Sequence, residues 1–195
     1  MKQFFFMILM LFAWDGYGQN YQAGLRLGDP YGISAKTDLN ENYAAEVIIG
    51  RGSPNSSQYY RRTFDQNKPF SSAIYDGQQV SGALSLQARL AYQESINNEF
   101  GITEGNLKGY AGLGVQLRNV AVSYFYHTPN PEEQSSGRVA ERSDIDLGPE
   151  GFFGAAYLFA DFPVEAFAEM GLLMELMNRL GHLKVQGAVG ARYRF

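Results

Sequence analysis

The chain ends in the stretch LKVQGAVGARYRF, residues 183–195, and this stretch decides the fold. Its side chains alternate without a break. The face that begins at Leu183 is apolar or glycine and ends on Phe195, whereas the face that begins at Lys184 holds Gln, Ala, Gly and two arginines. Successive side chains of a strand point to opposite faces, so a period of two predicts a β-strand. The pattern is much longer than the usual strand of about 5–6 residues.

The preceding segment, VEAFAEMGLLMEL at 164–176, repeats the alternation. Glu165, Glu169 and Glu175 fall on one face, and the other face is wholly apolar. A helix is the alternative, because Glu, Met, Leu and Ala favour helices. With about 3.6 residues per turn, however, the three glutamates would not keep to one side of a helix. We therefore predict a second strand.

Six further segments alternate in the same way, namely residues 21–28, 33–38, 43–50, 80–93, 110–118 and 150–159. The chain therefore has eight predicted strands. The connections on one side are residues 29–32, 52–79, 127–145 and 177–182, and those on the other are 39–42, 94–106 and 161–163. The two longest, 52–79 and 127–145, lie on the same side. Short periplasmic turns and longer extracellular loops are typical of outer-membrane barrels.

Alternation alone does not tell which face points inward, and a soluble barrel such as a lipocalin would bury its apolar face. The apolar faces here are long and carry almost no charge. The polar faces mix charges with Gly, Ala and Ser, which suits a narrow lumen filled by side chains. We therefore predict an all-β protein, an eight-stranded antiparallel transmembrane β-barrel. Its lumen should hold a structural network of charges: Arg26, Lys36, Glu46, Arg89, Glu150, Glu165, Glu169, Glu175, Lys184, Arg192 and Arg194.

The first residues have the form of an export signal. Met1-Lys2-Gln3 is a short basic start, Phe4–Trp14 is an apolar run, and Gly16-Tyr17-Gly18 offers small residues for cleavage. We expect residues 1–18 to be a signal peptide and 19–195 to be a single barrel domain. An N-terminal membrane anchor is the alternative, but the run is shorter than the roughly 20 residues that a spanning helix needs.

Composition excludes several classes of protein. The chain contains no Cys, which excludes a lipoprotein anchor, a disulfide scaffold and cysteine-based metal or redox sites. The net charge of −4, without a basic block, argues against nucleic acid as a partner. The two histidines, His127 and His182, are too far apart in sequence for a local metal-ligand cluster. We expect no metal and no cofactor.

The C-terminal stretch resembles the last strand of outer-membrane β-barrel proteins. Residues 31–36 through 44–50 resemble the second and third strands of small barrels of the outer membrane protein A and protein X type. Residues 148–157 through 161–164 resemble their sixth strand and the turn after it. The resemblance implies export to the outer membrane of a Gram-negative cell. It also implies that Phe195, with Tyr193 before it, is the signal read by the barrel-assembly machinery.

Hairpin geometry predicts which lumen charges meet. If the last two strands pair about the centre of 177–182, Glu165 lies opposite Arg194 and Glu175 opposite Lys184. Glu169 is then diagonal to Arg192. Pairing of the second and third strands about Glu41 sets Lys36 opposite Glu46.

One histidine invites an enzymatic interpretation. Barrel lipid A deacylases carry a His-x-Ser arrangement with a nearby acid, which works as a base and nucleophile pair. Here Pro129 stands two residues after His127, and Thr128 would point to the opposite face of a strand. Glu132 or Glu133 could orient the ring, but the nucleophile is missing at the required spacing. We therefore expect an exposed histidine at the edge of a loop, and no enzyme.

Two groups of aromatic residues point toward lipid. Tyr59-Tyr60-Arg61-Arg62, with Lys68, could bind lipopolysaccharide phosphates, but such clusters are common in solvated loops, and we favour that interpretation because four residues do not make a motif. A second group lies near predicted strand ends, where aromatic girdles meet the headgroups. It comprises Tyr21, Tyr43, Tyr92, Tyr157, Phe159, Tyr193 and Phe195.

These observations favour a structural or interaction role, in which a monomeric barrel exposes loops 52–79 and 127–145 at the cell surface. The expected partners are outer-membrane lipids, lipopolysaccharide and, during biogenesis, the assembly machinery. A narrow pore and a lipid A-modifying enzyme around His127 are the alternatives. An eight-stranded interior is just wide enough for side chains to fill it, which argues against open diffusion.

Overall fold

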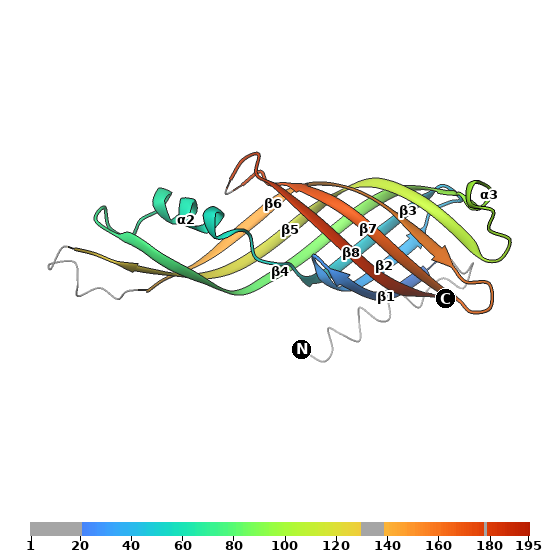
Figure 1. Cartoon of the computed structure of the whole chain (residues 1–195), viewed down its shortest axis with the longest axis horizontal. Coiled ribbons are helices and arrows are strands. Elements are labelled where there is room, and N and C mark those ends of the chain that lie inside the picture. The colour runs from blue at the N-terminus through green and yellow to red at the C-terminus, as the bar shows by residue number, and fades with distance from the viewer. Residues whose placement is uncertain (1–20, 130–138, 178) are drawn as a thin grey trace.

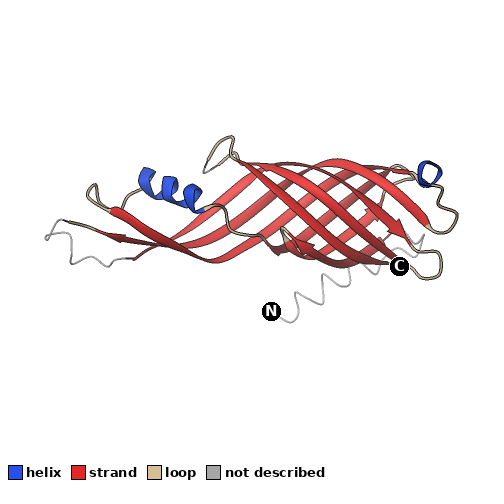
Figure 2. Ribbon diagram, viewed as in Figure 1, coloured by secondary structure: helices blue, strands red, loops and turns tan. Residues whose placement is uncertain are grey.

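The computed structural model describes residues 21–129, 139–177 and 179–195, and it is a single closed antiparallel barrel with strand order β1 to β8 (Figures 1 and 2). The eight-stranded fold predicted from the alternation is confirmed. The predicted signal peptide, residues 1–18, lies outside the described residues. The elements are β1 Tyr21–Gly28, β2 Tyr31–Asp38, β3 Tyr43–Arg51, α2 Ser57–Gln66, β4 Ile74–Ser95, α3 Asn97–Phe100, β5 Asn106–His127, β6 Val139–Leu158, β7 Val164–Met174 and β8 Leu183–Arg194.

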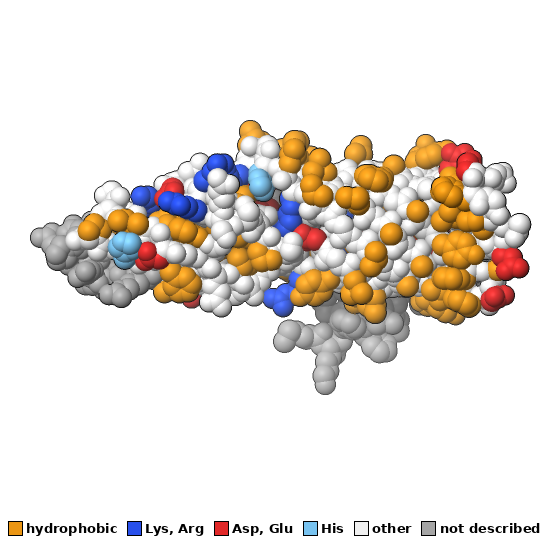
Figure 3. All heavy atoms as spheres, in the orientation of Figure 1, with side chains coloured by type: hydrophobic (Ala, Val, Ile, Leu, Met, Phe, Trp, Pro, Cys, Tyr) orange, Lys and Arg blue, Asp and Glu red, His pale blue; other side chains and the backbone are white. Residues whose placement is uncertain are grey.

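The outer surface of the barrel is apolar, and its interior is polar. Leu25, Ile33, Leu86, Leu113 and Leu172 are exposed, whereas their neighbours on the opposite face of each strand are buried or half-buried. Figure 3 shows hydrophobic side chains spread over the barrel wall. An aromatic girdle closes one end of this belt and includes the edge-to-face pairs Tyr43–Tyr92 and Tyr193–Phe195. This distribution is that of a membrane barrel and the reverse of that of a soluble one.

The predicted pairing of β7 with β8 is wrong by two residues. Glu165 lies opposite Arg192, not Arg194, and Lys184 lies opposite Leu173, not Glu175. The hairpin is centred one residue earlier than expected, and the hydrogen bond from the backbone N–H of Glu175 to the carbonyl of His182 continues the strand pairing in this register. Between β2 and β3, Lys36 does lie opposite Glu46, as predicted.

Three strands are much longer than predicted. β4 and β5 have 22 residues each and β6 has 20, whereas β1 and β2 have 8. The ends of the predicted loops 52–79 and 127–145 are therefore strand: β4 begins at Ile74, β5 ends at His127, and β6 begins at Val139. Together 74–83, 118–127 and 139–146 form a three-stranded sheet that continues beyond the barrel wall, and Figure 1 shows it projecting from one end. We call it the extension.

Helix α2 packs on the inner face of the extension. Ser56 caps it by accepting a hydrogen bond from the backbone N–H of Tyr59 (3.3 Å), and Tyr59, Tyr60, Thr63 and Phe64 form its buried face. Phe64 is fully buried against aromatic rings of β4 and β5. The extension thus has a small apolar core of its own: Tyr59, Tyr60, Phe64, Ala73, Ala83, Val120, Val122, Tyr124 and Tyr126. Among the described residues, neither helix is long and apolar enough to cross a membrane.

Candidate functional site

In the lumen, buried arginines each form ion pairs with acidic side chains from more than one strand. Arg192 of β8 lies 3.1 Å from Glu165 of β7, pairs with Glu46 of β3, and stacks 3.7 Å from the ring centre of Phe167. Its Nε also donates to Ser34 Oγ of β2 at 3.0 Å. Removing any acid therefore leaves a buried cation with fewer partners, which is costly in a site that excludes water.

A second centre lies further along the lumen. Arg89 of β4 pairs with Glu150 of β6 and lies 2.5 Å from Glu169 of β7, with Glu46 at 3.8 Å. Glu169 also pairs with Arg26 of β1 and accepts a hydrogen bond from the hydroxyl of Tyr110 at 3.0 Å. These contacts tie β1, β3, β4, β5, β6 and β7 across the interior.

The structure brings most of the predicted lumen charges together. Nine of the eleven are buried, namely Arg26, Lys36, Glu46, Arg89, Glu150, Glu165, Glu169, Glu175 and Arg192. Lys184 and Arg194 are half-buried at opposite ends of β8, and they pair with Asp29 at 2.9 Å and with Asp38 at 3.9 Å. Among the described residues, sequence reasoning missed two buried charged residues, Arg118 and Asp146, which lie 3.9 Å apart. Arg118 ends the alternating polar face of β5, so its side of the strand was visible in the sequence.

Neutral polar side chains fill the next layer. Gln87 donates to Gln186 at 3.5 Å, and Gln116 donates to Ser85 at 2.8 Å, and all four are buried. In the charged layer, a cavity of about 10 Å³ is lined by residues that include Lys36, Arg89 and Arg192. Such a cavity has about the space of one water molecule.

The segment that follows β3 crosses the mouth of the lumen. The carbonyl of Ser53 accepts from Arg118 and from Lys184, each at 2.6 Å, and the backbone N–H of Ser53 donates to Asp29 at 2.9 Å. The hydroxyl of Tyr59 donates to Glu175 at 2.8 Å and lies 3.4 Å from Asp146. This segment therefore contacts groups from the β1–β2 turn, β5, β6, β8 and the end of β7. We call this segment, residues 53–59, the mouth plug.

Glu175 lies one residue past β7, outside the membrane-spanning strand. Burial raises its pKa to about 7, and the neighbouring Asp146 acts in the same direction. The folded protein therefore keeps this acid protonated up to a higher pH than is usual for an exposed glutamate.

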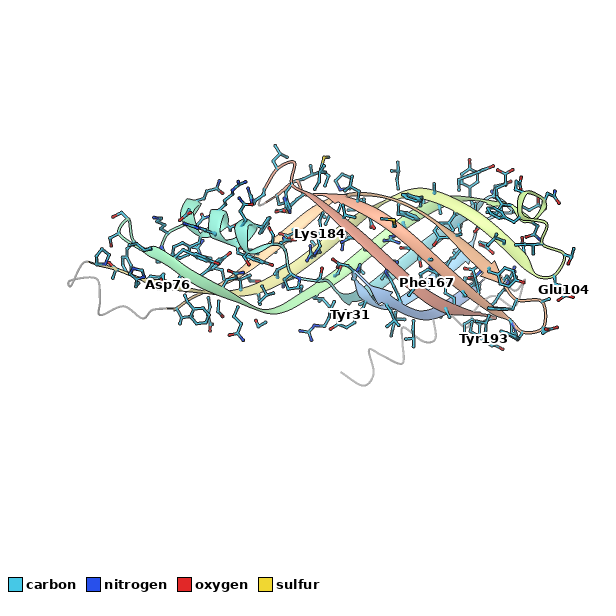
Figure 4. All side chains as sticks on the ribbon, in the orientation of Figure 1. Tyr31, Asp76, Glu104, Phe167, Lys184 and Tyr193 are labelled. Carbon is cyan, nitrogen blue, oxygen red and sulfur yellow. The ribbon has the colours of Figure 1, made fainter. Side chains whose placement is uncertain are left out.

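His127 stands at the far end of the extension, well away from the barrel. Its Nδ1 lies 2.6 Å from Asp76, and both side chains are about half exposed. Figure 4 shows Asp76 at this end, with Glu104 and Tyr193 at the opposite end of the molecule and Phe167 and Lys184 between. Thr128 points to the other face and pairs with Ser72. The candidate acids Glu132 and Glu133 lie outside the described residues.

The residues that the sequence offered as an alternative phosphate-binding cluster are divided by the fold. Tyr59 and Tyr60 are buried in the core of the extension, whereas Arg61 and Arg62 are exposed on the opposite side of α2. Lys68 lies 4.0 Å from Asp65. The tyrosines and arginines therefore do not form one binding surface.

Comparisons with known proteins agree with this architecture. No protein-family model matches the chain, and no curated protein matches its sequence. Among solved structures, the chain is similar to the N-terminal β-barrel domain of Pseudomonas aeruginosa OprF, with a TM-score of 0.54 and 12% identity over 90% of this chain and 96% of that one. It is also similar to a major outer membrane protein from Thermus thermophilus, with a TM-score of 0.50 and 12% identity over 90% of this chain and 98% of that one. The chain therefore has the fold of the small eight-stranded outer-membrane β-barrels.

Proposed function

We propose that this protein is an outer-membrane barrel with an interaction role, in which a sealed barrel anchors the extension at the cell surface. The observation that carries the proposal is that β4, β5 and β6 continue past the apolar belt as a sheet with its own core. A barrel that served only as a membrane anchor would not need a sheet with its own core outside the apolar belt. Loops and extensions held by a rigid scaffold are common carriers of binding function.

The free edge of β6 supports contact with another protein. Among the described residues, 139–145 have no strand partner on the side away from β5. The pairing of this stretch with β5 is regular, whereas β4 carries two register shifts in its outer part. Bulges are one way in which proteins protect an edge from pairing, so β6 is the more open of the two edges. An extended segment of a partner could add to it as a further strand.

The first experiment asks which end faces the outside. The chain has no Cys, so Glu141→Cys on the extension and Glu99→Cys on α3 each provide a single thiol. A membrane-impermeant maleimide should label the thiol at position 141 on intact cells. It should label the thiol at position 99 only after the outer membrane is permeabilised. The reverse pattern would refute the proposed orientation.

The second experiment asks whether the β6 edge binds. A photo-crosslinker attached at position 141 should form an adduct on intact cells. Adding Val139→Lys and Ile145→Lys should abolish that adduct, because edge lysines oppose strand addition. Undiminished cross-linking in the lysine variant would place the contact elsewhere.

A pore is the less favoured alternative. The paired arginines, the glutamine layer and the mouth plug fill the lumen, and the charged layer retains space for about one water molecule. The purified protein should therefore give no stable single-channel conductance in planar bilayers. Steady conductance would favour the pore.

An enzyme is also less favoured, because His127 and Asp76 are exposed at the tip of the extension and far from the lipid belt. Mass spectrometry of lipid A from a deletion strain should match the parent strain. A change in acylation restored by the wild-type gene, but not by His127→Ala, would establish the enzyme.

The proposed partners are outer-membrane lipids, lipopolysaccharide and the barrel-assembly machinery, and the barrel is proposed to be monomeric. Phe195 is exposed and packs edge-to-face on Tyr193, so both rings are available for recognition. Removing Phe195 should lower assembly in cells while refolding into detergent stays nearly unchanged. Normal membrane levels of the shortened chain would contradict the assembly role.

A further inference from the structure

The loop between β7 and β8, residues 175–182, carries large apolar side chains on its outside. Leu176, Met177 and Leu180 are 45%, 58% and 80% exposed, and Leu180 is the most exposed of the large hydrophobic side chains in the described part of the chain. None of the described residues from 176 to 183 is acidic. A water-facing loop with this composition would be unfavourable, because each apolar side chain gains by leaving water.

This apolar surface continues the belt of the barrel without a gap. Leu172 pairs with Val185 and Met174 pairs with Leu183, and all four side chains are exposed on the outer wall. Leu176 continues the alternation of β7 beyond Met174, and Leu180 precedes β8 in the same loop. In Figure 1 the loop bends away from the wall where β7 and β8 end, and hydrophobic side chains cover this region in Figure 3.

The inner side of the loop is fixed by polar contacts. The side-chain carboxyl group of Glu175 accepts a hydrogen bond from the backbone N–H of Arg179. The backbone carbonyl of Glu175 accepts one from the backbone N–H of Gly181, and both distances are 2.9 Å. The φ of Gly181 is +81°, which a residue with a side chain rarely adopts. The ring of His182 lies 4.9 Å from that of Tyr59, and the Arg179 guanidinium lies 5.0 Å above the same tyrosine ring. The loop therefore holds its polar groups toward the mouth plug and its apolar groups outward.

We propose that the β7–β8 loop is a lipid-inserting finger, with Met177 and Leu180 embedded in the upper acyl chains of the outer leaflet. Continuity with the lipid-facing wall identifies the partner as lipid. The proposal rests on the membrane location of the barrel but not on the role of the extension. Because His182 and Arg179 of the same loop contact the ring of Tyr59, insertion would also link the membrane surface to the mouth plug.

Tryptophan is a clean reporter, because Trp14 is the only Trp in the chain. In a full-length Trp14→Phe background, we would compare Leu180→Trp with Leu172→Trp in the belt and Ile74→Trp on the extension. Met177→Trp is a second reporter in case Leu180→Trp does not fold. Each protein is refolded into phosphatidylcholine vesicles that contain phospholipid brominated either near the headgroup or deep in the acyl chain.

We expect the Leu180→Trp protein to lose most of its emission to the shallow bromine label and less to the deep one. The Leu172→Trp protein should be quenched strongly by the deep label, and the Ile74→Trp protein should be quenched by neither.

Quenching of the belt reporter without quenching of either loop reporter would overturn the finger and leave the barrel in the membrane. No quenching of the belt reporter would instead overturn the membrane location. Blue-shifted emission from the Leu180→Trp protein without quenching would assign the loop to a contact with a second copy of the chain, and this too would overturn the proposal.

Discussion

Arg192 shows how many interactions a single lumen side chain can make. It is almost fully buried, it contacts Glu46 and Glu165, and it lies over Phe167. Arg194, two residues later on the same face, is half-buried and lies 3.9 Å from Asp38. The alternating sequence pattern places the two arginines on the same face of β8, but it does not show which of them is more deeply buried.

The first prediction compares these two arginines. Arg192→Glu places a third acid beside Glu46 and Glu165 and removes the cation that they share, and it should cost about 3–5 kcal/mol of unfolding free energy. Arg194→Glu breaks a long, partly solvated pair and should cost about 1 kcal/mol or less. The measurement is the urea midpoint of each variant in detergent micelles. Equal losses would favour the register with Glu165 opposite Arg194.

The second prediction concerns pH. Because the folded-state pKa of Glu175 is raised from 4.5 to about 7, its contribution to stability is complete below about pH 4.5 and is lost as pH rises through about 7. Asp146, Tyr59 and the Arg179 backbone N–H face this carboxyl group, with His182 and Lys184 nearby.

Glu175→Gln keeps an acceptor for Tyr59 and removes the titration. The urea midpoint of the Gln variant, measured relative to that of wild type, should therefore rise between pH 5 and pH 8. A constant difference over this range would mean that Glu175 does not titrate in the folded protein.

At the scale of elements, the sequence predicts strand faces better than strand ends. A slip of two residues keeps every side chain on its own face, so the alternation could not distinguish Arg192 from Arg194 as the partner of Glu165. The outer half of β4, with Tyr75-Asp76-Gly77-Gln78-Gln79, contains a turn-like Asp-Gly pair and a register shift, so it reads as a loop. Its strand conformation depends on pairing with β5 and on the cover given by α2, which are tertiary effects.

The third prediction tests whether the extension is an independent packing unit. Phe64→Ala empties the centre of its core, and a Phe→Ala change in a core typically costs about 3–5 kcal/mol. Hydrogen exchange should accelerate in 57–66, 74–83 and 118–127, while exchange in the barrel strands stays slow.

Phe125→Ala is the matched control, since this ring lies on the outer face of the same sheet and is 38% exposed. It should change exchange only slightly. Equal acceleration throughout the barrel in the Phe64 variant would show that the extension and the barrel open together.

At the scale of the whole molecule, the two-residue period, the even strand number and the alternating connection lengths were sufficient to predict the closed barrel. The closing pair, β1 with β8, joins the two ends of the described chain, and it follows from topology alone. The mouth plug could not be predicted. Ser53 contributes mainly backbone groups, and Tyr59 meets Glu175 and Asp146 only through the fold.

The fourth prediction tests which parts of the surface face lipid. Leu172 on the barrel wall and Ile74 on the extension are 43% and 46% exposed, so the two side chains are similarly exposed and differ mainly in where they lie. Leu172→Arg should cost roughly 2–4 kcal/mol when the protein folds into a bilayer, because it places a charge within the belt. Ile74→Arg should cost little. Folding free energies in vesicles provide the comparison, and equal costs would mean that the lipid boundary is misplaced.

The extension is continuous with the barrel strands, and this has a mechanical consequence. No loop separates it from the barrel, because β4, β5 and β6 each run through both parts as single strands, and the two register shifts between β4 and β5 lie within the extension. Ile74 lies about ten residues beyond Leu84 along β4, which corresponds to a reach of roughly 30 Å. A load applied at its tip would therefore pass into the barrel through the paired strands themselves, with no flexible linker between the two parts.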